Sequence, residues 1–189
     1  MDKPSLQTER LILRRWRDAD RDAFARMNAD PRVMEFFAAC LTREQSDAMI
    51  DRIESQFDAH GFGLFAAELR ATGELAGFIG LEIQDYEAFF TPCVEIGWRL
   101  GAAYWNQGMA TEGARVVIEF AFGTLELGEV VSTTTRGNLR SRRVMEKLGM
   151  RYAGDFEHPR LPEGHPLRPH VLYSLKLDDF RVLPHAPSS

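Results

Sequence analysis

The stretch from Trp105 to Glu112, WNQGMATE, contains the residue types of a phosphate-binding loop. It joins a predicted strand that ends at Leu100 to a predicted helix from Ala110 to Leu125. A helix N-terminus carries unpaired N–H groups and a partial positive charge, so it favours an anion. Gly108 lacks a Cβ and can adopt torsions closed to other residues, so a phosphate could approach the backbone closely. On Gly108 and Ala110 alone, an ordinary strand–helix loop is the better interpretation.

The segment 136–151 could hold a second part of an anionic ligand, since it contains six basic residues and the single acid Glu146. Asn138 is a good helix cap, and Ser141 falls on the first turn of the helix that follows. The chain has a net charge of −5, so this local run fits one anionic ligand better than a nucleic acid. A solvated helix face is the alternative. The basic residues are Arg136, Arg140, Arg142, Arg143, Lys147 and Arg151.

The elements that must position these segments follow from the hydrophobic pattern. Their order predicts a mixed α/β sheet with helices packed on it, and the strand–helix–strand unit in the second half implies a locally parallel pair. Thr42 to Gln45 has the form of a capping box. The predicted strands are 6–16, 62–70, 74–84, 92–100, 129–135, 150–157 and 169–176, and the predicted helices begin at Asp18, Thr42, Ala110 and Asn138.

Composition limits the class of protein. The 189 residues suit one domain, expected at 1–183, with a flexible tail at 184–189. Cys40 and Cys93 are far apart, which fits a reducing compartment, and we expect both to be small buried side chains. We find no signal-peptide core and no run of 18 apolar residues, so we expect a cytoplasmic protein without a membrane partner. The five histidines lack metal-ligand spacing, and we assign no metal.

Three pieces of the sequence carry a family resemblance: TERLILR (8–14), VEIGWRLGAAYWNQGMATEGARVVIEFAF (94–122) and NLRSRRVMEKLGM (138–150). The chain resembles the GNAT superfamily of acetyltransferases and, within it, the ribosomal-protein alanine N-acetyltransferase (RimJ/RimL-type) branch, over nearly its whole length. The resemblance implies the GNAT-like acyl-CoA N-acyltransferase fold. In that fold a mostly antiparallel central sheet has a splayed parallel pair and helices on both faces. It also implies acetyl-CoA as co-substrate.

The family's donor motif, Q/R-x-x-G-x-G/A, corresponds to Trp105-x-x-Gly108-x-Ala110, with Trp105 as a departure at the first position. Backbone amides are expected to make most of the pyrophosphate contacts. The resemblance also implies a splayed strand, about Glu95 to Leu100, that pairs with the pantetheine arm. The implied donor-binding residues are Ile96, Gly97, Trp98, Arg99, Leu100, Trp105, Asn106, Gln107, Gly108, Met109, Ala110, Thr111, Asn138 and, for the 3′-phosphate and adenine end, Arg142, Arg143 and Lys147.

The resemblance implies direct transfer in a ternary complex, without an acyl-enzyme. A backbone N–H near Gly97 or Trp98 is expected to stabilise the oxyanion. We predict that Ser141 helps to protonate the leaving thiolate and that Asn138 orients the pantetheine or the acceptor. A plain capping-turn serine is the alternative for Ser141. Many GNAT enzymes use a tyrosine as this acid, and Tyr152 is too far along the chain to match.

Glu95 is the first choice for the general base, with Glu68 and Glu82 as weaker alternatives. A carboxyl with an ordinary pKa of about 4.3 is a weak base, so burial would have to raise the pKa. An α-amine, with a pKa of about 7.7–8.0, needs less help than a lysine, which favours a peptide N-terminus or a small α-amine.

The acceptor pocket is expected between the helical segment after residue 18, the loop 86–92 and the loop 160–169. Its candidate wall residues share an aromatic ring, although aromatic residues at such positions more often pack in the core. They are Phe36, Phe37, Tyr86, Phe89 and Phe90.

Two other functions stay open at this stage. One keeps the donor and uses a small-molecule amine, such as a polyamine or an antibiotic, as acceptor. The other is a non-catalytic CoA-binding regulatory module. A homodimer is expected only from relatives.

Overall fold

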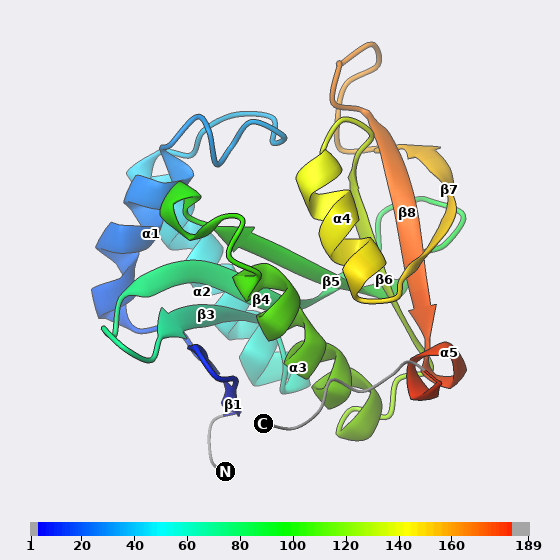
Figure 1. Cartoon of the computed structure of the whole chain (residues 1–189). Helices are drawn as coiled ribbons and strands as arrows, with labels where there is room; N and C mark the ends of the chain where they lie inside the picture. The colour runs from blue at the N-terminus through cyan, green and yellow to red at the C-terminus, as the bar shows by residue number, and fades with distance from the viewer. Residues whose placement is uncertain (1–3, 183–189) are drawn as a thin grey trace.

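The computed structural model describes residues 4–182, and the predicted tail lies outside them. Within this range the chain forms one eight-stranded mixed sheet with the order β1-β2-β3-β4-β5-β6-β8-β7 (Figure 1). The strands are β1 (Leu6–Gln7), β2 (Leu11–Arg14), β3 (Leu64–Leu69), β4 (Leu75–Gln84), β5 (Cys93–Leu100), β6 (Glu129–Thr135), β7 (Arg151–Glu157) and β8 (Pro169–Lys176). The α-helices are α1 (Arg21–Asn28), α2 (Arg43–His60), α3 (Met109–Gly123), α4 (Leu139–Lys147) and α5 (Leu177–Arg181).

The predicted parallel pair is confirmed and consists of β5 and β6. These two strands pair in register only at Glu95 and Val131, whereas β6 pairs with β8 along its whole length. Beyond residue 95, β5 therefore leaves β6, and the sheet opens between them. The other neighbouring strands are antiparallel, as the mostly antiparallel expectation requires.

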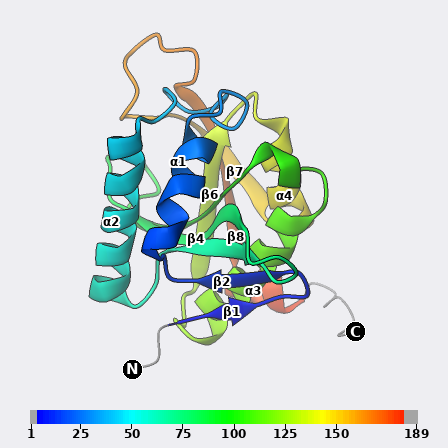
Figure 2. The same ribbon diagram turned by 90° about the vertical axis from the view of Figure 1, so that its left-hand side faces the viewer.

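Helices cover both faces of the sheet. Neighbouring residues on a strand point to opposite faces, and on β4 these are Phe78 and Ile79. Phe78 packs against Phe24 of α1, whereas the Ile79 side chain lies directly over Gly113 of α3. Helices α1 and α2 therefore lie on one face and α3 on the other, and Figure 2 shows α1 and α2 side by side.

The caps and the apolar stripes of the longer helices follow the sequence. Thr42 accepts a hydrogen bond from the Gln45 amide, the Gln45 side chain accepts one from the Thr42 amide, and Gly61 ends α2 at φ 76°. The predicted apolar stripe of α3 is buried against the sheet, and this packing fixes the position of the helix N-terminus. Its fully buried members are Ala114, Val117, Ile118 and Ala121.

Four expectations are wrong in detail. The predicted strand 6–16 is interrupted, because the Thr8 hydroxyl accepts a hydrogen bond from the Leu11 amide and turns the chain between β1 and β2. The helix expected from Asp18 begins as a short 3₁₀ turn, Asp18–Asp20, before α1. Helix α5 was not predicted. Cys40 is exposed and Cys93 only partly buried, so they are not two buried cysteines, because Cys40 lies in the loop before α2 and Cys93 at the start of β5.

No helix within residues 4–182 combines the length and the apolar character that a bilayer crossing needs.

Candidate active site

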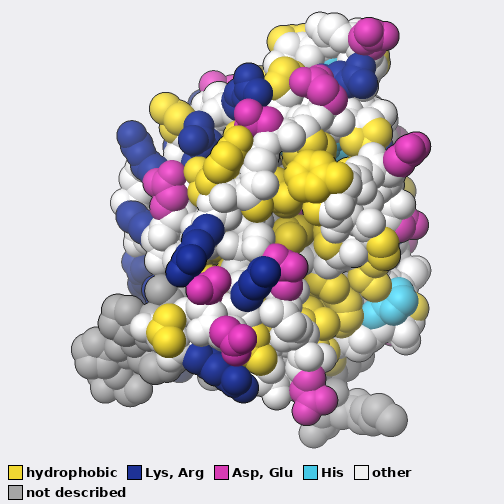
Figure 3. Space-filling model, turned by 90° about the vertical axis from the view of Figure 1, so that its right-hand side faces the viewer, with side chains coloured by type: hydrophobic (Ala, Val, Ile, Leu, Met, Phe, Trp, Pro, Cys, Tyr) yellow, Lys and Arg dark blue, Asp and Glu magenta, His cyan; other side chains and the backbone are white. Residues whose placement is uncertain are grey.

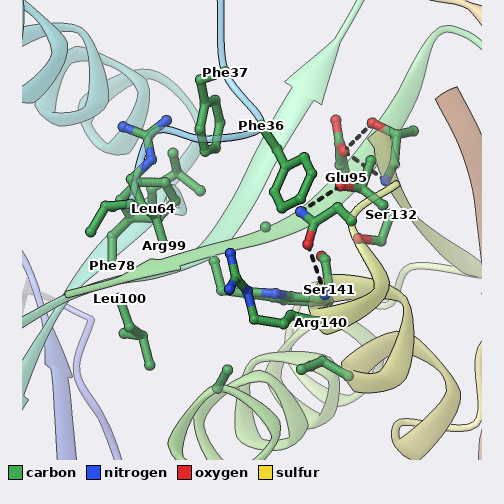
Figure 4. A pocket seen from close by; sticks show the side chains of 18 of the residues that line it. Phe36, Phe37, Leu64, Phe78, Glu95, Arg99, Leu100, Ser132, Arg140 and Ser141 are labelled. Carbon is green, nitrogen blue, oxygen red and sulfur yellow. Dashed lines mark hydrogen bonds between the residues drawn. The ribbon is translucent and has the colours of Figure 1, made fainter. Parts of the chain in front are cut away.

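A cavity of about 710 Å³ opens where β5 and β6 diverge. Its floor is β5, one side is formed by the N-termini of α3 and α4, and the other side by the loop after α1 and the segment between β7 and β8. Figure 4 shows Phe36 and Arg140 pointing into this space from opposite sides. The cavity joins the two segments that the sequence singled out, the loop 105–112 and the start of α4.

The loop before α3 is shaped to receive an anion. Gly108 is the N-cap of α3, adopts φ +79° and offers no side-chain cap, so the first amides of the helix remain available to a ligand. Gly108, Met109, Ala110 and Thr111 all line the cavity. The Trp105 indole N–H donates to the Leu100 carbonyl at 2.8 Å, which fixes the loop to the end of β5.

The turn between β1 and β2 holds this loop from outside the cavity. Arg10 donates through Nη1 to the Gln107 carbonyl at 2.9 Å and through Nε to the Glu112 carboxylate at 2.7 Å. Burial alone would raise the pKa of Glu112, but hydrogen bonds from Thr8 and Arg10 outweigh it and hold that pKa below its ordinary value. The segment TERLILR (8–14), which carries part of the family resemblance, therefore holds the predicted phosphate loop in place but does not line the cavity.

At the start of α4, Asn138 lines the cavity and its side chain caps the helix. Its Oδ1 accepts from the Ser141 amide at 3.2 Å and its Nδ2 donates to Thr134 Oγ1 at 2.9 Å. Ser141 lines the cavity, and its hydroxyl has no hydrogen-bond partner among residues 4–182. Asn138 therefore positions the helix N-terminus, while the Ser141 hydroxyl remains available to a ligand.

Two of the three basic residues predicted for the 3′-phosphate line the cavity. Arg143 and Lys147 do so, whereas Arg142 donates to the Tyr173 hydroxyl at 3.4 Å on the other side of α4. Helical spacing accounts for this difference, since residues 140, 143 and 147 share one face of a helix. Arg140, which we did not select, lines the cavity too, with its guanidinium 4.3 Å from the Trp105 ring centroid.

Glu95 lies where the strands begin to separate, at the floor of the cavity. Its Oε1 accepts hydrogen bonds from Thr133 N at 2.9 Å and Thr133 Oγ1 at 2.7 Å. Burial raises the pKa of Glu95 to about 7, against the opposing hydrogen bonds of Thr133 and with a further rise from the neighbouring Glu82. Glu82 also lines the cavity, but Glu68 does not, because it forms ion pairs with Arg14 and Arg17.

The proposed acceptor walls divide into two groups. Phe36 and Phe37 line the cavity, whereas Tyr86, Phe89 and Phe90 do not. Tyr86 and Phe90 pack with Phe156 in an aromatic cluster beside β7, and the Phe89 side chain is 70% exposed. Figure 3 shows the face of the molecule turned away from α1 and α2, where apolar side chains are exposed among charged ones.

The segment between β7 and β8 contributes His158, Arg160 and Leu161 to the cavity, and β8 contributes His170. We had expected only the loop 160–169. The two histidine rings lie 4.8 Å apart, and burial lowers the pKa of both, to about 4 for His158. No local spacing could have revealed this pair, because β7 and β8 bring its members together from 12 residues apart.

Besides Arg142, two predicted donor residues lie away from the cavity surface. Ile96 is fully buried on the far side of β5, and the Gln107 side chain donates to the Ala103 carbonyl at 2.8 Å. The other donor-binding residues expected on β5 and in the loop line the cavity: Gly97, Trp98, Arg99, Leu100, Trp105 and Asn106.

Within residues 4–182 the open mixed sheet, whose parallel pair splays beside two helix N-termini, together with the family match that follows, identifies an acyltransferase enzyme. The family described as Acetyltransferase (GNAT) domain matches residues 10–151, and the chain belongs to this family. Acetyltransferases of this family use acetyl-CoA.

Relatives agree with this assignment. The uncharacterized N-acetyltransferase YnaD of Bacillus subtilis is 30% identical over 153 residues, covering 80% of this chain and 85% of YnaD. The FsC-acetyl coenzyme A-N(2)-transacetylase of Aspergillus fumigatus is 30% identical over 161 residues, covering 82% of this chain and 68% of that protein.

Solved structures share the fold. A GNAT-family acetyltransferase from Bacillus anthracis has a TM-score of 0.77 at 26% identity, covering 92% of this chain and 98% of that one. RimJ of Mycobacterium smegmatis, solved in complex with CoA-disulfide, has a TM-score of 0.75 at 17% identity, covering 93% and 88% of the two chains.

Proposed function

We propose that the protein is an acetyl-CoA-dependent N-acetyltransferase that acetylates an α-amine, either a peptide N-terminus or a small molecule, by direct attack in a ternary complex. The observation that carries this proposal is Glu95, a carboxyl with a pKa of about 7 in the cavity that also contains the phosphate loop and Ser141. A base with this pKa matches an α-amine at neutral pH.

The described residues fit the donor. The uncapped amides after Gly108 suit a pyrophosphate, and Arg143 and Lys147 suit the 3′-phosphate at the far end of the same wall. The edge of β5 that faces β6 has no partner strand beyond Glu95, so its backbone can pair with an amide-containing arm. Acetyl-CoA supplies an activated acetyl thioester when it binds.

Each catalytic requirement has a residue in this cavity. Glu95 takes a proton from the α-ammonium group, and the neutral amine then attacks the thioester carbonyl. A backbone N–H at Gly97 or Trp98 stabilises the oxyanion. Ser141 sits on the first turn of α4, where the helix dipole favours a thiolate. Its hydroxyl can donate a hydrogen bond to the leaving thiolate and pass on a proton that it regains from water. Asn138 keeps this turn in place.

The names of one relative and of two structural neighbours support an amine acceptor. The name of the A. fumigatus relative specifies acetyl coenzyme A and an N(2) position, which supports nitrogen as the acceptor atom. Distant structural neighbours include a ribosomal-protein-S5-alanine acetyltransferase and RimJ, which supports the branch that acts on α-amines of protein N-termini.

The test is an acetylation assay with acetyl-CoA and three acceptor sets: peptides with a free α-amine, Nα-blocked peptides with a lysine, and polyamines. We expect mass spectrometry to show acetylation in the first set. Acetylation of only the second or third set would overturn the α-amine proposal. Thermal stabilisation by acetyl-CoA without any turnover would instead support a regulatory CoA-binding module.

A further inference from the structure

Arg99 is a buried cation without a carboxylate partner. Its side chain is 9% exposed, and among residues 4–182 no Asp or Glu lies within ion-pair distance of it. Nη1 donates to Asn28 Oδ1 at 2.8 Å, while Nε is buried without any hydrogen-bond partner. Burying a guanidinium without a counter-charge is strongly unfavourable, so this arrangement requires an explanation.

Two aromatic rings lie against the guanidinium, and neither supplies a negative charge. The Arg99 Cζ lies 4.0 Å from the Phe37 ring centroid and 5.2 Å from that of Phe78 (Figure 4). Such cation–π contacts occupy the faces of the guanidinium plane, whereas its N–H groups donate within the plane. The Arg99 side chain lines the cavity, so an anion there could accept from that edge.

Arg99 shares one face of β5 with Gly97 and Glu95, because side chains alternate along a strand. Glu82 lies directly across from Glu95 on β4. The cavity floor is therefore acidic at one end and basic at the other, roughly 13 Å apart along the strand. A Cβ added at Gly97 would meet no atom within 4 Å, so the space between the two ends is open.

A ligand complementary to this floor is positive at the Glu95 end and negative at the Arg99 end. We infer that the acceptor carries a carboxylate, which Arg99 binds while the reacting amine lies above Gly97, toward the Glu95 end of the floor. This inference rests on the proposed function. With the amine above Gly97, the carboxylate lies roughly 6–7 Å away, about two residues of extended chain. Both the C-terminus of a dipeptide and an acidic side chain after the N-terminal residue satisfy this spacing.

Arg160 is the matched control for Arg99. It also lines the cavity, but from the segment between β7 and β8, and its side chain is 61% exposed with Asp85 at 3.9 Å. Both arginines bring the same charge to the cavity, so a general electrostatic effect would depend on both. A carboxylate held on the floor would depend on Arg99 alone.

The experiment compares acid and amide peptides in two arms. The first arm uses Ala-Ala against its C-terminal amide, and the second uses Ala-Glu-Ala amide against Ala-Gln-Ala amide. Each is measured with the wild type, Arg99→Met and Arg160→Met, both as acetyl acceptor (kcat/KM) and as ligand of the CoA-bound enzyme (Kd by calorimetry). Thermal melts and the Arg99→Lys variant identify any loss caused by misfolding, because lysine keeps the charge.

We expect the wild type to prefer the acid in at least one arm by roughly 10- to 100-fold, the range of a charge-assisted pair. Arg99→Met should remove this preference by weakening the acid far more than the amide, while Arg160→Met should keep the preference. Equal kcat/KM and Kd for acid and amide, or a preference lost with Arg160→Met, would overturn the inference and leave the α-amine proposal intact. Preferential binding of the acid without any acetyl transfer would overturn the proposed function and retain Arg99 as the carboxylate site.

Discussion

Replacement of Glu95 by glutamine should lower activity and raise stability at the same time. The pKa of this carboxyl rises from 4.5 to about 7 on folding, so the folded state holds its proton more tightly than the unfolded chain does. Stability is therefore lost as pH rises from about 4.5 to 7, and the loss is complete above that range. This pKa difference corresponds to roughly 3 kcal/mol of unfolding free energy.

Glutamine removes that cost, and its side-chain oxygen can still accept from Thr133 N and Oγ1. At pH 8 the Glu95→Gln variant should melt roughly 6–12 °C above the wild type, and at pH 4.5 the two should melt together. In the same variant kcat/KM should fall by roughly 10²- to 10⁴-fold, the contribution of a positioned base.

The pH dependence separates a base from a merely structural carboxyl. The amine titrates identically with both enzymes, so the ratio of wild-type to Glu95→Gln kcat/KM reports Glu95 alone. This ratio should rise with pH and level off above a midpoint near pH 7. Glu82→Gln is the control, because it removes a neighbouring carboxylate that raises the pKa of Glu95. This variant should keep activity and move the midpoint to lower pH. A ratio that stays flat between pH 5.5 and 8.5 would refute the assignment.

Four further predictions rest on the same geometry. Lys147→Ala should weaken acetyl-CoA binding roughly five- to tenfold by calorimetry but leave dephospho-CoA unaffected, whereas Arg142→Ala should change neither Kd. Asn138→Ala should destabilise the protein by about 1 kcal/mol in thermal melts through loss of the α4 cap, and Asn138→Asp should retain it. Ser141→Ala should lower kcat with little change in melting temperature; unchanged kcat would leave Ser141 without a catalytic role. Gly97→Leu should melt within about 2 °C of the wild type, because a Cβ there meets no atom, yet raise the acceptor KM.

The elements and the donor loop could be predicted because the signals are local. Apolar spacing located α3, capping residues located α2 and α4, and Gly108 marked the turn before α3. The distinction between Arg142 and its neighbours could also have been drawn, since the buried Met145 on α4 fixes which face of the helix turns toward the sheet.

The acceptor side could not be predicted in the same way, because its residues meet only through long-range packing. His158 and His170 come together through the pairing of β7 with β8, and no spacing along the chain signals it. The loop that contains Tyr86 and Phe90 is apolar enough to form a pocket wall, but those rings pack against Phe156 instead. An aromatic residue in a loop therefore does not indicate which cavity it will face, and Phe89 in this loop is exposed.

Two buried arginines show how structural and functional charge can be told apart in this fold. Arg14 is 7% exposed and forms ion pairs with Asp20 and Glu68. The hydrogen bond to Asp20 raises the pKa of Arg14 above its ordinary value. Arg99 is buried to almost the same extent, but burial lowers its pKa to about 10, with Glu82 opposing too weakly to offset the loss. The same fold neutralises the Arg14 guanidinium with two carboxylates, but among residues 4–182 it places none at ion-pair distance from Arg99. The uncompensated charge lies instead on the cavity floor, where perturbed groups concentrate when a ligand completes the site.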